Sequence, residues 1–415
     1  MGFLCRAALL FGLALSAAAP AADDYWGYAY RNIDVTASGT GAYAVNLARY
    51  CVRLDSLLTQ ILSIRASDRL PTHLYALPAG QMKRYTAGDY SSVYHSSGYD
   101  VTVIMDSSEV PNGRHYWGAY FGYTATLLSS DRLLGGPDWY MVGVPSVFAD
   151  AVFEGAKVKI GNVTPGFAYT LTTGGALIPM RTFLGLRQRD AEAKGKHFLD
   201  MYDAEAWYLA REVFVERLHR AEFGKYLDLM RRGTDEPAAF AASFAISYED
   251  LDRELAQGMR ERAHVYIMDA PDDPSAGSAI AARLDATEVK ARLALLSVRY
   301  QHGPDALQLA GEVRQKAPGN ETALRALALA LLAKGAYPEA LAAVDQLLAQ
   351  GASDAARADC AYVLDGLARA TAQGDAHLDA AALRERALAE YRHALSSDVT
   401  DRRSRDGLAR LEHSP

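Results

Sequence analysis

The chain has 415 residues, enough for two or three domains that each bury a core of their own. Half of the residues are hydrophobic and 22% are charged, as in ordinary globular proteins. The formal net charge of −7, together with the lack of any cluster of Lys and Arg, excludes a nucleic-acid-binding protein that relies on bulk electrostatic attraction.

Residues 1–22 have the order of a secretory signal peptide. Arg6 precedes an apolar run at 7–15, and a stretch of small residues follows at 16–22. We therefore expect cleavage near Ala21 or Ala22 and a periplasmic or secreted mature protein. The alternative is an uncleaved membrane anchor, although the run is shorter than the ~20 apolar residues that span hydrocarbon. No later stretch reaches that length, so no membrane span is expected after cleavage.

The block from residue 23 to residue 268 alternates strand and helix patterns. Period-two or β-branched runs predict strands at 30–37, 72–76 and 100–105, and apolar residues at helical spacing predict helices at 42–64 and 80–85. Beyond His115 the pattern is helical. It includes helices at 202–220, 224–231 and 247–257, the last of which opens with the capping pattern Ser247-Tyr-Glu-Asp250.

The last block consists of helical repeats. Residues 269–280 are rich in Pro, Gly, Asp and Ser and predict a linker, after which Ala and Leu dominate residues 281–415. A 34-residue unit beginning at Glu321 places Gly335 at the turn between two helices and Tyr337 on the second helix. One period earlier, Pro318 falls where the preceding unit ends.

This block resembles the tetratricopeptide repeat family, which implies an all-α solenoid with a protein or peptide partner. The alternative is a generic antiparallel helical bundle.

An aromatic segment marks the first block. Residues 139–148 (WYMVGVPSVF) resemble a metallopeptidase segment with a Trp, an aromatic residue, any residue, then Glu and Gly. In order and spacing, the whole block resembles the peptidase MA-like, gluzincin-type metallopeptidases. The resemblance implies an α+β fold, with a thermolysin-like domain of small sheet and helical lobe at 23–268 followed by the repeats.

The residues that would bind zinc in such a peptidase are missing. The family needs two His at i and i+4 with a Glu beside the first, and a third-ligand Glu further along the chain. The resemblance places these positions at Phe121, Gly122, Ala125 and Val142. No HExxH sequence occurs anywhere in the chain, so we expect no metal, no cofactor and no peptidase activity.

Aromatic residues are dense around this degenerate site. The set comprises Tyr116, Trp117, Tyr120, Phe121, Tyr123, Trp139 and Tyr140. They either fill a core or line a groove that holds a peptide or glycan without cutting it. Tyr120, Tyr123, Trp139 and Tyr140 are the candidate binding residues of such a groove.

Three arginines are candidates for a second binding surface. Arg292, Arg299 and Arg325 would lie on the concave face of the repeats, where they could hold the carboxylate of an extended peptide. The two cysteines beyond the signal peptide, Cys51 and Cys360, predict neither a metal site nor a disulfide, and Cys51 lies on an apolar helix face.

Three functional hypotheses remain open. The first is an exported, non-catalytic interaction or scaffold protein with a pseudo-metallopeptidase domain and repeats. The second is a peptide- or glycan-binding module that uses the aromatic groove. The third is a hydrolase with a non-standard site that uses Asp150, Glu154 or Glu205.

Overall fold

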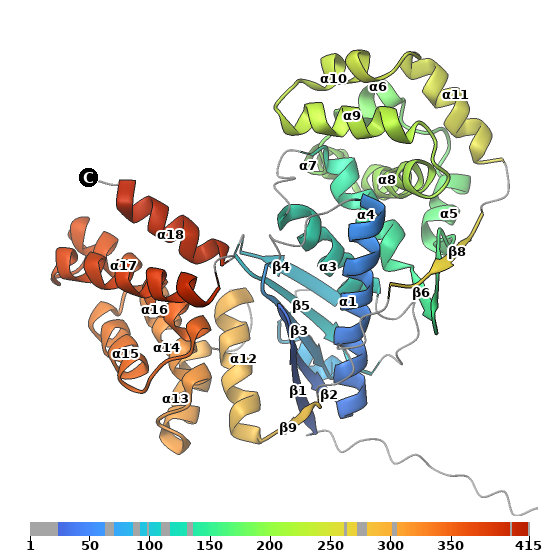
Figure 1. The fold of residues 1–415 in the computed structure, drawn as a ribbon. Coiled ribbons are helices and arrows are strands. Elements are labelled where there is room, and N and C mark those ends of the chain that lie inside the picture. The colour runs from blue at the N-terminus through green and yellow to red at the C-terminus, as the bar shows by residue number, and fades with distance from the viewer. Residues whose placement is uncertain are drawn as a thin grey trace, which may run out of the picture.

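The computed structural model describes residues 24–62, 70–85, 92–97, 99–108, 117–130, 136–260, 264–271, 280–300, 305–398 and 401–413. The expected signal peptide lies outside these residues, as do Tyr116 and residues 272–279 of the expected linker. None of the described helices combines the length and the apolar character needed to cross a bilayer. The architecture is mixed α+β, with a six-stranded sheet near the N-terminus and a helical region at the C-terminus (Figure 1).

The large sheet has the strand order β4-β5-β3-β2-β1-β9. Its strands are β1 (Tyr25–Tyr30), β2 (Ile33–Ser38), β3 (Thr72–Leu77), β4 (Ser92–Ser96), β5 (Val101–Asp106) and β9 (Ala282–Leu284). Strands β2, β3 and β5 are parallel, whereas β4, β1 and β9 pair with their neighbours in the antiparallel sense.

The strands predicted at 72–76 and 100–105 are confirmed as β3 and β5. The strand predicted at 30–37 is wrong in extent, because the chain turns at Arg31 and forms the β1–β2 hairpin. Arg31 has a positive φ of 53°, which its residue type does not signal.

Both faces of this sheet are covered by helices. Side chains of a strand alternate between its two faces. Leu74 and Ala76 of β3 therefore join the core beneath helix α1 (Gly41–Leu62), and Tyr75 and Leu77 join a second core with helix α12 (Ala286–Tyr300). Figure 1 shows α1 and α12 on opposite sides of the strands. The helical region is thus joined to the sheet twice, through β9 and through α12.

A helical lobe and a three-stranded sheet stand between β5 and β9. In chain order they comprise α3 (Trp117–Ser130), α4 (Asp138–Ala149), β6 (Val152–Glu154), β7 (Lys157–Ile160), α5 (Pro165–Thr173), α6 (Met180–Phe183), α7 (Gln188–Ala193), α8 (Lys196–Phe214), α9 (Arg220–Arg231), α10 (Glu236–Ser243), α11 (Tyr248–Gly258) and β8 (Tyr266–Asp269). Helix α8 packs against α4, and Gly143 permits the approach because a Cβ there would lie 2.1 Å from the carbonyl oxygen of Ala206.

Two predictions in this lobe have different outcomes. The helix predicted at 202–220 is wrong at its end, because α8 stops at Phe214. Arg217 and His219 have positive φ angles that no helix accommodates. The capping box of Ser247 and Asp250 is confirmed at the start of α11, where each side chain accepts a hydrogen bond from the other residue's backbone amide.

The C-terminal region consists of helical hairpins. After α12 come α13 (Ala306–Lys316), α14 (Glu321–Ala333), α15 (Tyr337–Ala349), α16 (Asp354–Ala372), α17 (Ala380–Ser397) and α18 (Arg402–His413). Asn320, Ser353 and Asp379 cap α14, α16 and α17 by accepting backbone amides. The helix α14 begins at Glu321, and Gly335 occupies the following turn with a φ of 75°, so the predicted start and turn are confirmed.

The remaining parts of the hydrophobic core lie within these hairpins. Ala340 and Val344 of α15 are fully buried, as are Leu364 and Leu367 of α16. Cys51 and Cys360 are both free and buried.

Candidate functional site

The four positions at which the metallopeptidase resemblance would place the zinc ligands and the general base lie on the packed helices α3 and α4. Phe121 is half-buried and stacks on Trp117 with ring centroids 4.9 Å apart, whereas Ala125 and Val142 are buried in the core. None of these side chains carries an atom that binds zinc or transfers a proton.

Gly122, where the metallopeptidase resemblance would place the general base, has no room for a side chain. A Cβ at this position would lie 2.8 Å from the Cβ of Tyr94 and 3.3 Å from Cγ2 of Val103. Strands β4 and β5 therefore lie directly against the helix. A glutamate here would require the edge strand to move.

The four aromatic candidate residues are parts of the core. Tyr120, Tyr123 and Trp139 are at most 1% exposed, and Tyr140 is 3% exposed. Tyr120 stacks on Tyr50 with centroids 3.9 Å apart. The structure therefore fills the region in which sequence analysis left a possible open groove.

Among the described residues, no three His, Cys, Asp or Glu side chains are grouped so that they could hold a metal ion. Cys51, the other nucleophile considered, is fully buried, and burial raises the pKa of its thiol. A thiol that stays protonated is a poor nucleophile.

The three carboxylates of the hydrolase hypothesis lie in different surroundings. Glu154 is exposed and pairs with Lys159 at 2.7 Å. Asp150 accepts a hydrogen bond from the Thr164 hydroxyl beside a cleft of about 490 Å³. Glu205 is fully buried, and burial raises its pKa to about 8.

The cleft beside Asp150 lies between α3, α5 and α8. Trp117 and Phe167 provide an apolar wall, and Asp200 and Asp203 provide carboxylates. Burial raises the pKa of Asp203 to about 6, and Gln188 donates a hydrogen bond to it over 3.1 Å. Neither aromatic residue of this wall was among the four candidate binding residues, although Trp117 belonged to the aromatic set noted in the sequence.

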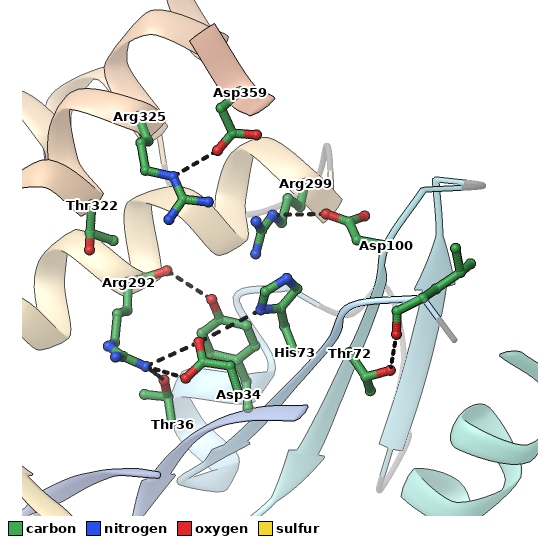
Figure 2. Close-up of polar contacts among 12 residues, drawn as sticks. Asp34, Thr36, Thr72, His73, Asp100, Arg292, Arg299, Thr322, Arg325 and Asp359 are labelled. Carbon is green, nitrogen blue, oxygen red and sulfur yellow. Dashed lines mark hydrogen bonds and ion pairs between the residues drawn. The ribbon is translucent and has the colours of Figure 1, made fainter. Parts of the chain in front are cut away.

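The three candidate arginines lie on the side of the helical region that faces the sheet, and each has a carboxylate partner from the same chain. Figure 2 shows Arg292 and Arg299 on α12 directed at the sheet, with Arg325 on α14 above them. Arg292 contacts Asp34 of β2 at 3.0 Å and Arg299 contacts Asp100 at 3.1 Å.

The third arginine belongs to a larger buried group. Arg325 donates from Nε to Oδ2 of Asp359 over 2.7 Å, and Arg403 of α18 donates to the other carboxylate oxygen. Asp359 is 4% exposed, and the two guanidinium groups keep its pKa below the ordinary range against the effect of burial.

No protein-family model, curated protein or solved structure matches this chain. The similarities to metallopeptidases and to tetratricopeptide repeats therefore remain predictions.

Sequence analysis missed the partners of these arginines. Asp34 of β2 lies 258 residues before Arg292, and Asp100, just before β5, lies about two hundred residues before Arg299, so no local pattern connects these carboxylates with α12. One partner did leave a signal. Asp359 follows Arg325 by 34 residues, the length of one repeat, so both residues occupy the same face of successive first helices.

Proposed function

We propose that this chain is an exported, non-catalytic interaction protein, in which a degenerate metallopeptidase-like domain carries repeats of the tetratricopeptide type. The proposal has three parts, concerning the repeats, the binding surface and the lost catalytic site.

The geometry of the hairpins supports the assignment of the repeats. The first helices α12, α14 and α16 begin at residues 286, 321 and 354, close to one 34-residue period apart. Small residues stand at the contacts between them. A Cβ at Gly366 of α16 would lie 2.7 Å from Leu332 of α14, so these helices can approach closely only because residue 366 is a glycine.

A groove along these helices carries the functional proposal. It has a volume of about 780 Å³ and lies between the C-terminal ends of α12, α14 and α16. Leu329, Leu332 and Tyr362 form apolar walls, and the exposed cations Lys334 and Arg369 stand at its rim. Such a surface, apolar inside and charged at the edge, suits an extended peptide segment of a partner protein.

The state of the former catalytic site supports a role without chemistry. The position of the general base is a glycine without space for a side chain, and the aromatic residues around it are core. The rings in this part of the described structure stack on one another, Tyr120 on Tyr50 and Phe121 on Trp117, as in a packed core.

The test begins with selection of peptides from a displayed random library on the immobilised mature chain. Binding of a selected peptide is then measured by fluorescence anisotropy to two variants with matched chemistry. Ala333→Trp fills the groove from an exposed position on α14, whereas Ala238→Trp places the same side chain at an exposed position on α10. We expect Ala333→Trp to weaken binding by at least about tenfold, or about 1.4 kcal/mol, and Ala238→Trp to leave it unchanged.

Two results would overturn the proposal. The first is equal binding of the peptide to both tryptophan variants, which would place the binding surface elsewhere. The second is hydrolysis of unfolded casein by the wild-type chain, with or without added zinc, at a rate above that of the heat-inactivated protein. Hydrolysis would mean that a catalytic site exists outside the degenerate positions.

A further inference from the structure

A polar chamber lies where the large sheet meets the helical region. Its volume is about 190 Å³, and its buried lining includes His73, Asp100, Arg299, Arg325, Asp359 and Arg403. It is separate from the groove on the repeats and from the former zinc site. Figure 2 shows Arg299, Arg325 and His73 directed toward one space between the helices and the ends of the strands.

The fold brings these residues together from six elements or their ends. Strands β3 and β5 are parallel with Thr72 opposite Val101, so His73 and Asp100 stand at the same edge of the sheet. Helix α12 carries Arg299 across this edge, and α14 and α16 contribute Arg325 and Asp359 from equivalent repeat positions. The final helix, α18, closes the group with Arg403.

Two arginine N–H donors in this chamber have no partner among the described residues, namely Nη1 of Arg299 and Nε of Arg403. Nε2 of His73 is also unpartnered, and its Nδ1 lies 3.7 Å from Asp34, beyond normal hydrogen-bonding distance. The Arg299 side chain is only 10% exposed. Buried charged donors are rarely left unsatisfied, so their arrangement indicates a bound group that accepts hydrogen bonds.

The buried carboxylates do not satisfy these unpartnered donors, because they already pair with other arginine nitrogens. Asp100 forms an ion pair with Arg299 at 3.1 Å and accepts a hydrogen bond from the Ser97 hydroxyl at 2.6 Å. Asp359 accepts from Arg325 and Arg403 on its two oxygens. The unused hydrogen-bonding capacity at the buried end therefore consists mainly of donors, which favours an oxyanion.

Carboxylates lie at the solvent side of the chamber. Asp354, Asp398 and Asp401 also line the chamber. The Asp354 side chain is 53% exposed, against 4% for Asp359. The chamber thus presents donors at its buried end and carboxylates near its mouth. A multiply charged anion such as phosphate would meet repulsion there, whereas a ligand with a cationic group would be attracted.

We propose that the chamber binds a small zwitterion of amino-acid size, with its carboxylate toward Arg299, Arg403 and His73 and its ammonium group toward the carboxylates at the mouth. The site joins elements of the sheet to the last helix of the chain. It does not depend on the peptide-binding role of the groove. The two surfaces share no lining residue, although both include residues of α16.

The experiment is isothermal titration calorimetry on the full mature chain with four probes, namely L-alanine, L-glutamate, acetate and inorganic phosphate, each to about 10 mM. We expect at least one amino acid to bind at least about tenfold more tightly than acetate or phosphate. Arg403→Lys keeps the charge but removes the Nε donor, and we expect it to weaken amino-acid binding at least about fivefold. The matched control is Arg392→Lys, an exposed arginine on α17 that pairs with Glu412 at 2.9 Å.

A second variant tests the mouth without disturbing buried groups. Asp354→Asn should weaken amino-acid binding but should not weaken any acetate binding, because acetate has no cationic group that Asp354 attracts. Circular dichroism and the thermal midpoint of each variant show whether its fold is intact. No binding of any amino acid, equal affinity for acetate or phosphate, or equal binding by Arg403→Lys and Arg392→Lys would each overturn the proposal. In that case water satisfies the buried donors.

Discussion

Glu205 offers a test of how the helical lobe is built, because it is a carboxyl group sealed in the core. It is 0% exposed on α8. Its Oε2 accepts the backbone amide of Ile178 over 2.8 Å, while Oε1 is without a partner among the described residues. Burial raises its pKa from 4.5 to about 8, with a smaller contribution from the nearby charge of Asp252. The folded protein therefore holds this proton at neutral pH.

The pH dependence follows from proton linkage. Between about pH 4.5 and about pH 8 the unfolded chain releases the Glu205 proton while the folded chain keeps it. The unfolded state then binds fewer protons, so stability is greatest below this window and falls as the pH rises through it. From about pH 5 to about pH 7.5, a pKa difference of this size removes about 3 kcal/mol of folding free energy.

The perturbation is Glu205→Gln, which keeps the shape and an acceptor for Ile178 but removes the ionisable group. Urea unfolding followed by tryptophan fluorescence at about pH 5 and about pH 7.5 gives the free energy of unfolding of variant and wild type. We expect the difference between them to shift by about 3 kcal/mol in favour of the variant at the higher pH. Glu192→Gln, on exposed α7, is the control and should show no such shift.

An equal difference at both pH values would refute the reasoning, because it would mean that Glu205 ionises as readily in the folded protein as in the unfolded chain. That result would also support the hypothesis that Glu205 is a reactive group of a hydrolase. The expected result leaves it a neutral core residue, which no substrate reaches.

Three further changes test other parts of the structure. Gly122→Ala should lower the free energy of unfolding by about 1–3 kcal/mol in urea titrations, because its Cβ would overlap Tyr94; no loss would show that α3 has room for a side chain. Asp359→Asn leaves two buried guanidinium groups without a charged partner, so we expect the free energy of unfolding to fall by about 3–5 kcal/mol in urea titrations. An unchanged free energy of unfolding would contradict the burial of the network. Gly407→Ala places a Cβ 2.3 Å from the Tyr391 ring, so the amides of α18 should exchange their hydrogens faster than in the wild type. Unchanged exchange rates would contradict the packing of α18 on α17.

The parts of the fold that sequence reasoning recovered depend on local patterns. The helix α14 begins at Glu321, where the 34-residue period placed it, and α11 begins at its capping box. The buried parallel strands β3 and β5 were recovered because short β-branched or apolar runs are frequent in such strands.

The missed parts depend on contacts between distant segments. Strand β9 has three residues and exists because it pairs with β1, more than two hundred and fifty residues earlier. Strand β4 is an edge strand with the half-exposed Tyr94, so its pattern of buried positions is weak. The arginines on α12 were recognised as a group, but their use as partners of Asp34 and Asp100 follows only from the packing of α12 on the sheet.

The proposed groove and the proposed chamber meet at one pair of side chains. Tyr362 lines the groove, and the guanidinium of Arg403 lies over its ring at 4.2 Å while also donating to Asp359 in the chamber. A ligand that fixes Arg403 would therefore also fix one wall of the groove. Linkage requires the converse with equal strength, so a peptide that orders Tyr362 would raise the affinity of the chamber by the same factor. If both proposals hold, this contact is the physical means by which binding of a peptide in the groove would depend on a small ligand in the chamber.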